Sequence, residues 1–365
     1  MSNNQLVFVG TYTRREPHVE GKSEGIYVYR LDVATGALAH VSTMAGIDNP
    51  SYVELHPNGR FLYAANEVGD YGGQSSGAVS AFAIDADAGQ LTLLNHQPSH
   101  GSAPCHVTVD ATGRYVLSAN YTGGSVCVHP INADGSLAPS SCFIQHEGSS
   151  INPQRQGEAH AHSINMDKQN RRAFVADLGM DKVMIYNLDM LSGKLTPNDP
   201  PWTTVTPGQG PRHFDFHPSG QYAYLINELG STISVFAYDQ DAGSLTELQN
   251  ISTLPAGYEG RSHCADIHVH PSGRFVYGSN RGHDSIACYG IDQATGLLTL
   301  IGIESTQGKV PRNFAIDPTG HILLAANQNS HNIVTYRIDQ ETGALTPTGQ
   351  QASAPTPVCL KLLEL

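Results

Sequence analysis

The chain has 365 residues, of which 33 are acidic and 20 are basic, so its formal net charge is −13 at pH 7. Binding to a phosphate backbone requires clustered Lys and Arg, and no basic run is present, so the composition excludes a nucleic-acid partner. With no apolar run of about 18 residues, no signal-peptide start and six scattered Cys without a Cys-x-x-Cys pair, the sequence predicts a cytoplasmic protein with reduced thiols and no membrane partner.

The first predicted strand is LVFVGTY, residues 6–12, a short apolar run rich in β-branched and aromatic side chains. It has the form of the second strand in a four-stranded unit whose first strand is missing. The strand that completes this unit must therefore come from elsewhere in the chain.

From there one short motif recurs seven times: a small polar residue and then Gly-x-Leu, closing a stretch of alternating apolar and polar residues. The glycines are Gly36, Gly89, Gly135, Gly193, Gly243, Gly296 and Gly343. The shortest interval, Gly89 to Gly135, is 46 residues, and the longest, Gly135 to Gly193, is 58 residues. A repeat of that length accommodates four short strands, which is the size of one propeller blade.

A second motif lies between successive copies of the first: an alternating apolar run that ends in His/Asp-Pro-x-Gly. Close copies are residues 50–59, 211–220 and 311–320, and looser copies are 104–113, 161–170 and 264–273. A strand-like run such as FLYAAN or YAYLIN follows each copy. In the turn itself, Pro presets φ at one corner and Gly occupies the corner that other residues resist.

The last predicted strand is PTPVCLKLL, residues 355–363, which has the form of a first strand with nothing after it. Joined to the N-terminal segment, it completes a seventh blade from both ends of the chain. Such closure removes free sheet edges. The sequence therefore predicts an all-β fold: one domain over residues 1–365, a seven-bladed β-propeller of four-stranded antiparallel blades closed by the C-terminal strand.

Loop lengths predict which face of the ring carries function. The turns after the first and third strands are short and uniform, whereas the other connections vary, as in residues 14–24, 67–76, 145–158 and 256–261. Variable loops on a rigid scaffold are where binding sites usually lie. Function is therefore expected where first strands begin and second strands end.

Two repeat positions open on that face, and each holds different residues in different blades. The start of the first strand holds Ser51, Cys105, His162, Arg212, Ala265, Arg312 and Val358. The end of the second strand holds Glu67, Tyr121, Glu228, Arg281 and Gln328, with Tyr12 and Leu178 in degenerate copies. A structural role would make these positions alike, so the collected charges predict a functional site.

Other interpretations of the same residues stay open. The Arg and Glu residues can form a structural ion-pair network. His160 and His162 share one strand face and could pair on a metal, although no carboxylate lies beside them. The turn histidines His56, His217 and His270 are expected to cap local backbone, and so are the asparagines that recur at the ends of second strands.

Two segments carry a resemblance to a known family: residues 208–236, which contain Pro-Arg-His and Asn-Glu-Leu, and residues 263–286, which contain Ser-Asn-Arg-Gly-His. They resemble the bacterial propeller-type 6-phosphogluconolactonases, whose superfamily includes the fungal carboxy-muconate lactonizing enzymes. The resemblance extends through all seven repeats, and the opening FVGTYT fits it.

The resemblance implies hydrolysis of 6-phospho-D-glucono-1,5-lactone to 6-phosphogluconate in the pentose phosphate pathway, without a metal or other cofactor. The functional His, Arg, Glu and Arg of the fungal relatives fall on His162, Arg212, Glu228 and Arg281. Substrate contacts are expected from His160, His213, Arg312, Glu67 and His283. The partner implied is a small anionic sugar lactone, and the oligomeric state stays open between a monomer and a weak dimer.

The residue types suit lactone opening, which needs an activated water and a positive site for the developing oxyanion. Glu228 is the candidate base or water-positioning group, Arg212 or Arg281 the oxyanion ligand, and a second Arg or His the phosphate ligand. His162 could donate to the leaving ring oxygen. A carboxylate between two arginines has a lowered pKa, which weakens it as a base.

Two functions of other kinds remain. One is lactonization of an unsaturated dicarboxylate such as carboxy-muconate, with the same arginines holding carboxylates. The other is a non-catalytic interaction propeller, for which apolar patches at the ring opening are expected. The calcium-dependent sugar-lactone propellers have a carboxylate-rich centre, which differs from the Arg- and His-rich one predicted here.

Overall fold

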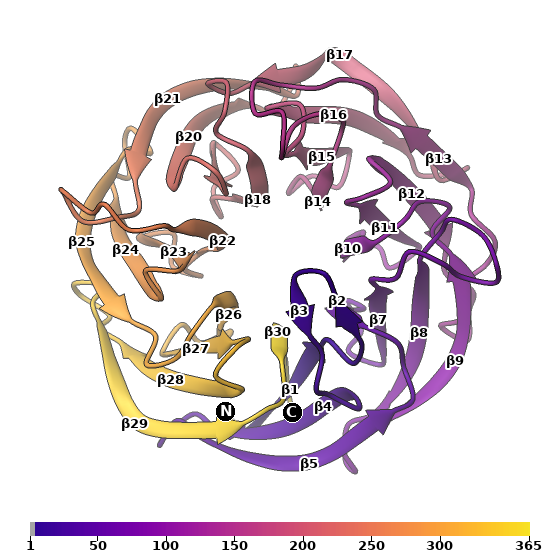
Figure 1. Cartoon of the computed structure of the whole chain (residues 1–365), viewed down its shortest axis with the longest axis horizontal. Coiled ribbons are helices and arrows are strands. Elements are labelled where there is room, and N and C mark those ends of the chain that lie inside the picture. Colours follow the sequence, from indigo (N-terminus) through magenta and orange to yellow (C-terminus); the bar gives the residue numbers. More distant parts are fainter. Residues whose placement is uncertain (1–3) are drawn as a thin grey trace.

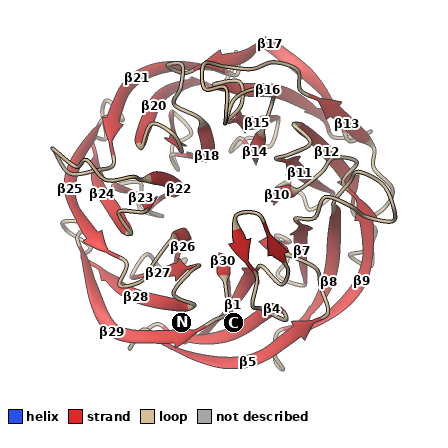
Figure 2. Ribbon diagram, in the orientation of Figure 1, coloured by secondary structure: helices blue, strands red, loops and turns tan. Residues whose placement is uncertain are grey.

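The computed structural model describes residues 4–365, and these form strands and turns without a helix, so none forms a helix able to cross a membrane. Seven four-stranded antiparallel sheets stand around a central axis (Figures 1 and 2). This arrangement confirms the predicted seven-bladed β-propeller. A small hairpin of β2 (Arg15–Glu16) and β3 (Val19–Glu20) forms a separate two-stranded sheet.

In six of the seven blades the strands follow chain order from the axis outward. The first blade contains β6 (Pro50–Leu55), β7 (Phe61–Asn66), β8 (Ala78–Asp85) and β9 (Gln90–Pro98). The second contains β10 (Pro104–Val109), β11 (Tyr115–Asn120), β12 (Ser125–Pro130) and β13 (Cys142–Gln145). The third contains β14 (Ala161–Met166), β15 (Arg172–Asp177), β16 (Lys182–Asp189) and β17 (Lys194–Thr204).

The next three blades repeat this order. The fourth contains β18 (Pro211–Phe216), β19 (Tyr222–Asn227), β20 (Thr232–Asp239) and β21 (Ser244–Ser252). The fifth contains β22 (His263–Val269), β23 (Phe275–Arg281), β24 (Ser285–Ile291) and β25 (Leu298–Ser305). The sixth contains β26 (Pro311–Ile316), β27 (Ile322–Asn327), β28 (Asn332–Ile338) and β29 (Leu345–Ser353).

The seventh, closing blade is assembled from both ends of the chain. Its order is β30 (Pro357–Glu364), β1 (Asn4–Thr11), β4 (Gly25–Asp32) and β5 (Ala37–Ala45). β1 and β30 are antiparallel, with Leu6 opposite Leu363 and Gly10 opposite Cys359. The predicted closure by the C-terminal strand is therefore confirmed, and the indigo and yellow ends of the chain meet in Figure 1.

Removal of β30 is expected to destroy the fold. Val358, Cys359 and Leu360 are buried, and without them the closing blade loses its inner strand and β1 is left unpaired on its inner edge. We expect a chain truncated after Pro355 to show no cooperative thermal transition by circular dichroism. A chain lacking only the exposed Leu365 serves as the control, and a soluble truncation at Pro355 with a cooperative transition would contradict the prediction.

The hydrophobic core is divided among the interfaces between neighbouring blades. Phe174 of the third blade stacks on Phe214 of the fourth at a ring-centroid distance of 5.7 Å, with Phe216 edge-on at 5.1 Å. Second strands are buried on both faces, as in β7, whereas outer strands such as β21 are largely exposed. The apolar runs that predicted the second strands therefore pack against a blade on either side.

The two repeat turns join each blade to the next. Nδ1 of His217 accepts from the backbone N–H of Ser219, and Nε2 donates to the carbonyl of Gly273 in the following blade at 2.8 Å. At Gly296, φ is +72°, and an added Cβ would collide with the ring of Tyr222 in the preceding blade. The expected capping role of the turn histidine holds, and the Gly-x-Leu motif is also a contact between blades.

A β-bulge near the start of each first strand controls what faces the axis. In the fourth blade Pro211 pairs with Asn227 and His213 with Ile226, so Arg212 is the extra, unpaired residue. The corresponding bulge residues, here called the mouth layer, are Ser51, Cys105, His162, Arg212, Ala265, Arg312 and Val358. Bulges re-aim side chains and are common beside active sites.

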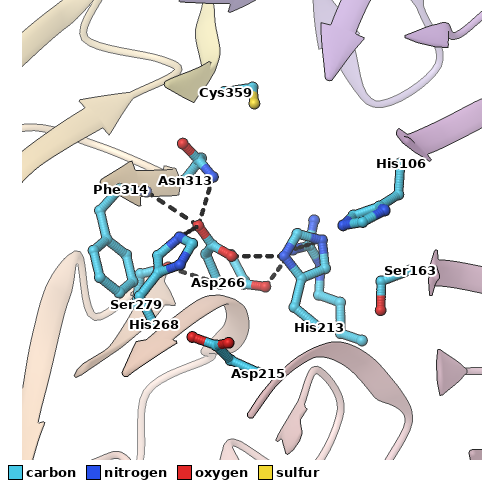
Figure 3. A network of polar contacts seen from close by, with 12 residues as sticks. His106, Ser163, His213, Asp215, Asp266, His268, Ser279, Asn313, Phe314 and Cys359 are labelled. Carbon is cyan, nitrogen blue, oxygen red and sulfur yellow. Dashed lines mark hydrogen bonds and ion pairs between the residues drawn. The ribbon is translucent and has the colours of Figure 1, made fainter. Parts of the chain in front are cut away.

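The residue after each bulge belongs to a middle layer, one step further along the axis. Its members are Tyr52, His106, Ser163, His213, Asp266, Asn313 and Cys359, six of which Figure 3 shows converging on the centre of the ring. Because side chains alternate along a strand, a lower layer follows two residues later. That layer includes Glu54, Asn165, Asp215, His268 and Lys361, which line a cavity of about 130 Å³.

Candidate active site

Glu228 is the centre of a buried ion-pair cluster at the mouth of the ring. It directly follows β19, and its side chain is only 6% exposed. Oε2 accepts from Nε of Arg212 at 2.9 Å and from Nη2 of Arg281 at 2.8 Å. Arg212 is a mouth-layer bulge residue and Arg281 ends β23, so the two repeat positions picked out in the sequence meet at this carboxylate.

A third arginine, absent from the sequence-based candidates, completes the cluster. Arg155 lies in the connection between β13 and β14, and its Nη2 donates to Oε1 of Glu228 at 2.5 Å. The same nitrogen donates to the hydroxyl of Tyr121 at 3.2 Å. Both oxygens of Glu228 are thus held by guanidinium groups.

The charges around Glu228 set its protonation state. Burial alone would raise the pKa of Glu228, but Arg281, Arg212 and Arg155 hold it well below the usual glutamate value. Conversely, burial, with Arg281 and Arg312 nearby, lowers the pKa of Arg212 to about 10. At neutral pH the carboxylate is therefore ionised and the guanidinium still carries its charge.

His162 lies beside this cluster in the mouth layer. Its ring contacts Tyr121 edge-on at 5.2 Å and His213 at 5.4 Å, and its Nδ1 is 3.7 Å from Sγ of Cys105. Burial, followed by the charge of Arg212, lowers the pKa of His162 well below 6.5. His162 is therefore a neutral imidazole at pH 7, able to donate a hydrogen bond but not to act as an imidazolium acid.

His160 approaches the mouth from the same segment. Its ring stacks on Tyr121 with centroids 4.6 Å apart and an interplanar angle of 14°. Its Nδ1 donates to the carbonyl of Tyr121 at 3.0 Å, which fixes the ring. The two histidines thus flank one tyrosine, and among residues 4–365 no group of three His, Cys, Asp or Glu side chains is placed to hold a metal ion.

A second carboxylate cluster belongs to the first, sixth and closing blades. Oε2 of Glu67 accepts from the hydroxyls of Ser51 at 2.6 Å and Tyr12 at 2.7 Å. Arg312 lies 4.0 Å from Oε1 of Glu67, and its guanidinium packs over the ring of Tyr12. Burial lowers the pKa of Arg312, but Tyr12 and Glu67 outweigh it and raise the pKa overall.

The two clusters together leave the mouth positively charged. Four arginines, Arg155, Arg212, Arg281 and Arg312, face two glutamates, Glu67 and Glu228, so two positive charges remain when the histidines are neutral. This local excess opposes the net charge of −13 of the whole chain. An anionic ligand is therefore favoured at this mouth.

The hairpin of β2 and β3 brings a further histidine to the mouth. Figure 1 shows the hairpin reaching toward the centre of the ring, and Nε2 of His18 lies 3.2 Å from the hydroxyl of Tyr12. Val19 packs in a small core with Tyr12 and Val358. Beside the hairpin is a cavity of about 500 Å³, whose lining includes His18, Lys22, Asn329 and His331.

Next to the mouth layer, side chains of the middle layer form a hydrogen-bond chain across the centre of the ring (Figure 3). Nη1 of Arg212 donates to Nε2 of His213 at 3.3 Å, and Nδ1 of His213 donates to Oδ1 of Asp266 at 2.6 Å. The other carboxylate oxygen of Asp266 accepts from His268 at 2.9 Å and from Asn313 at 2.5 Å. Burial and Arg212 lower the pKa of His213 to about 4, so it is neutral and its tautomer is fixed by Asp266.

The structure thus brings most of the sequence-predicted residues to one place, with three distinctions. Glu228, Arg212, Arg281 and His162 form one group with His160 beside it, and Glu67 and Arg312 form the second. Both ring nitrogens of His213 have protein partners, so it supports Arg212 from behind. His283 does not reach Glu228: its Nδ1 bonds to Ser285 at 2.7 Å and its ring packs on Tyr258.

Arg155, Asp266 and His18 are the site residues that sequence reasoning missed. Arg155 and His18 lie in connections whose length and sequence differ from blade to blade, so alignment of the repeats gives them no position. Asp266 had a usable signal, since it is the residue after a bulge position, where the other blades hold His106, His213 or Asn313. Comparing the residue after the bulge position, as well as the bulge position itself, across the blades would have identified Asp266.

Comparisons with known proteins agree with this geometry. The family model described as "Lactonase, 7-bladed beta-propeller" matches residues 6–362. A 6-phosphogluconolactonase of Bacillus subtilis (strain 168) is 39% identical over 310 residues, covering 85% of this chain and 84% of the relative. A 6-phosphogluconolactonase of Formosa agariphila is 37% identical over 315 residues, covering 85% and 86%.

Solved structures extend the agreement over the whole chain. One from Bacteroides fragilis NCTC 9343, provisionally named a 6-phosphogluconolactonase, has a TM-score of 0.91 and 36% identity, covering 100% of this chain and 99% of its own. A periplasmic gluconolactonase of Pseudomonas aeruginosa also has a TM-score of 0.91, with 33% identity and 99% of both chains covered. These names differ in whether the substrate carries a phosphate.

Proposed function

Because the chain belongs to the seven-bladed β-propeller lactonase family, we propose that it hydrolyses 6-phospho-D-glucono-1,5-lactone to 6-phosphogluconate, a step of the pentose phosphate pathway. The observation that carries the proposal is the ionised, buried Glu228 set among three guanidinium groups in a mouth of net positive charge. The guanidinium groups can bind a negatively charged lactone and stabilise a developing oxyanion, and the carboxylate can accept a proton from the attacking water.

In the proposed reaction Glu228 acts on the water. Its carboxylate accepts a proton as the water oxygen bonds to the lactone carbonyl carbon. When the tetrahedral intermediate collapses, the bond from that carbon to the ring oxygen breaks, and the same proton passes from Glu228 to the ring oxygen. The product is the open hydroxy acid, which loses its carboxyl proton to solvent.

Arg281 and Arg212 stabilise the charge that develops on the carbonyl oxygen. Both are fixed on strands of the ring and hold Oε2 of Glu228, so a carbonyl placed beside the carboxylate lies within reach of their remaining N–H groups. Fixed donors aimed at a developing oxyanion need no reorganisation during the reaction. The neutral His162 contributes a hydrogen bond to the sugar ring and no proton.

Paired assays of two freshly prepared lactones test the proposed function. We expect the protein to hydrolyse 6-phosphogluconolactone and to hydrolyse glucono-1,5-lactone with a lower kcat/KM, because the charged mouth favours the anion. A pH-stat assay measures both rates, corrected for spontaneous opening. Because arginines supply the positive charge, EDTA should leave both rates unchanged; no rate above the spontaneous one for either lactone would refute the proposal.

The proposed compartment is the cytoplasm. All six cysteines are free, and five of them are buried, as suits a reducing environment. Fractionation of cells that express the full chain would test this, and recovery with periplasmic markers would place the protein with its Pseudomonas relative instead.

A further inference from the structure

Arg155 differs in kind from the other two arginines that hold Glu228. Arg212 and Arg281 lie on strands, and their side chains are 2% and 16% exposed, whereas the side chain of Arg155 is 35% exposed and extends from a loop. It also holds Oε1 alone, while Oε2 is shared by the two strand arginines. One oxygen of the carboxylate is therefore covered by a group that solvent can reach.

The backbone around Arg155 is fixed, so only its side chain has freedom. The N–H of Gln156 donates to the carbonyl of Asn152 at 2.7 Å, and the buried Gln156 side chain donates to the carbonyl of Leu178 at 2.9 Å. Ser150 of the same loop bonds to Asp181 at 2.5 Å. The loop thus presents a long cationic side chain from a rigid anchor, as an anion-binding arginine requires.

Arg155 also blocks the group that the reaction needs. Oε2 already accepts from two guanidinium groups and Oε1 from Arg155 at 2.5 Å, so the acceptor site left for a water is on Oε1, directly beside the Arg155 guanidinium. The charged and titratable groups that face Glu228 from the surrounding elements are Arg212, Arg281, His263, Arg155, His162, Tyr121, Arg312, His18, Cys105 and Cys264. Of these, Arg155 is the ion-pair partner that is not built into a strand.

We propose that Arg155 is the ligand of the substrate's phosphate group, and that its transfer from Glu228 to the phosphate uncovers Oε1 for the attacking water. The proposal rests on the proposed lactonase function. The exchange replaces one anionic partner of Arg155 by another, so no buried charge is left without a counterion. Glu228 at the same time keeps two guanidinium partners instead of three and becomes a stronger base.

In consequence, binding of the substrate's phosphate group and activation of the base Glu228 occur together. A phosphorylated lactone draws Arg155 away and meets an active carboxylate. A lactone without the phosphate leaves Arg155 paired with Glu228, whose carboxylate is then partly covered and less basic. Discrimination between the two substrates should therefore appear in kcat as well as in KM.

The test compares Arg155→Ala, Arg155→Lys and the control Arg261→Ala on both lactones. Arg261 is an exposed arginine near the same mouth that bonds to His263 and makes no contact with Glu228, so it controls for general loss of positive charge. In Arg155→Ala we expect kcat/KM for the phosphorylated lactone to fall about tenfold to a hundredfold, the worth of one charge-assisted hydrogen bond. The kcat for plain gluconolactone should stay or rise.

A second readout is the pH profile, which reports the ion pair between Arg155 and Glu228 and should be unchanged in the Arg261→Ala control. In Arg155→Ala the acid limb of kcat/KM should move to higher pH, because Glu228 has lost one cation. Arg155→Lys should restore the position of that limb while recovering only part of the phosphate preference, since an ammonium cannot form the bidentate contact.

One result would overturn the proposal while leaving lactone hydrolysis in place: Arg155→Ala leaves the ratio of kcat/KM between the two lactones unchanged, whether both values fall equally or neither falls. If the wild-type protein hydrolyses neither lactone, the proposed function fails, and binding then decides the role of Arg155. Calorimetry with inorganic phosphate and with 6-phosphogluconate should show weaker binding to Arg155→Ala than to Arg261→Ala. Equal binding would overturn the proposal.

Discussion

Replacing Glu228 by glutamine is expected to lower kcat for 6-phosphogluconolactone by about a hundredfold to ten-thousandfold, the usual contribution of general base catalysis. The amide preserves shape and can still accept from Arg212, but it cannot take a proton from water. Single-turnover kinetics would measure the loss, and circular dichroism would show that the propeller remains folded. A variant with wild-type turnover would make Glu228 a structural member of an ion-pair network.

The same variant changes the pH dependence of stability in a defined direction. The pKa of Glu228 is depressed in the folded state, so its ionised form stabilises the fold above the ordinary glutamate pKa, and this contribution is lost as the pH falls through the depressed value. Glu228→Gln should therefore remove part of the acid-side decline in the free energy of unfolding. Urea titrations between neutral and acid pH would measure that slope.

Replacing Arg212 by alanine is expected to reduce both activity and stability. An oxyanion ligand contributes on the order of 2–4 kcal/mol of transition-state stabilisation. Breaking a buried ion pair by removing one partner costs a further ~3–5 kcal/mol in the free energy of unfolding. Arg212 also donates to the carbonyl of Ala265 and to His213, so the middle layer loses its cationic donor.

A matched control is available for this variant. Arg172 is also a buried arginine, but it bonds to Asn198 and to the carbonyls of Gln240 and Asp241, away from the mouth. Arg172→Ala should lower the free energy of unfolding while its folded fraction keeps wild-type kcat. If Arg212→Ala behaves in the same way, Arg212 has no part in the reaction.

The fold could be predicted because the repeats overdetermine it. Six blades carry a close or loose copy of the same turn, and every blade has an apolar second strand and a Gly-x-Leu motif. An irregular copy in one blade can therefore be recognised from the others. The closing blade could be predicted because the segments LVFVGTY and PTPVCLKLL are each part of an incomplete blade, and together they supply the strands of one complete blade. No single strand had to be recognised by itself.

Site residues could be predicted only where they occupy positions that recur in every blade. Arg212, Glu228 and Arg281 occupy positions that every blade has, so their departure from the other blades is visible in the sequence. Arg155 reaches Glu228 from a loop whose path depends on Gln156 and Asn152, and no local pattern encodes that path. His283 illustrates the converse, because the turn at Gly282 and Asp284 leaves its ring on Tyr258.

The β-bulges of the first strands have a consequence for how such an enzyme can acquire new substrates. Each mouth-layer residue is the one left out of the ladder, so its identity is not constrained by the pairing of β18 with β19 or of its counterparts. Exchanging it alters the chemistry of the opening without changing the strand register. The ring therefore offers seven positions at which evolution, or a combinatorial library, can vary the reaction while the scaffold stays constant.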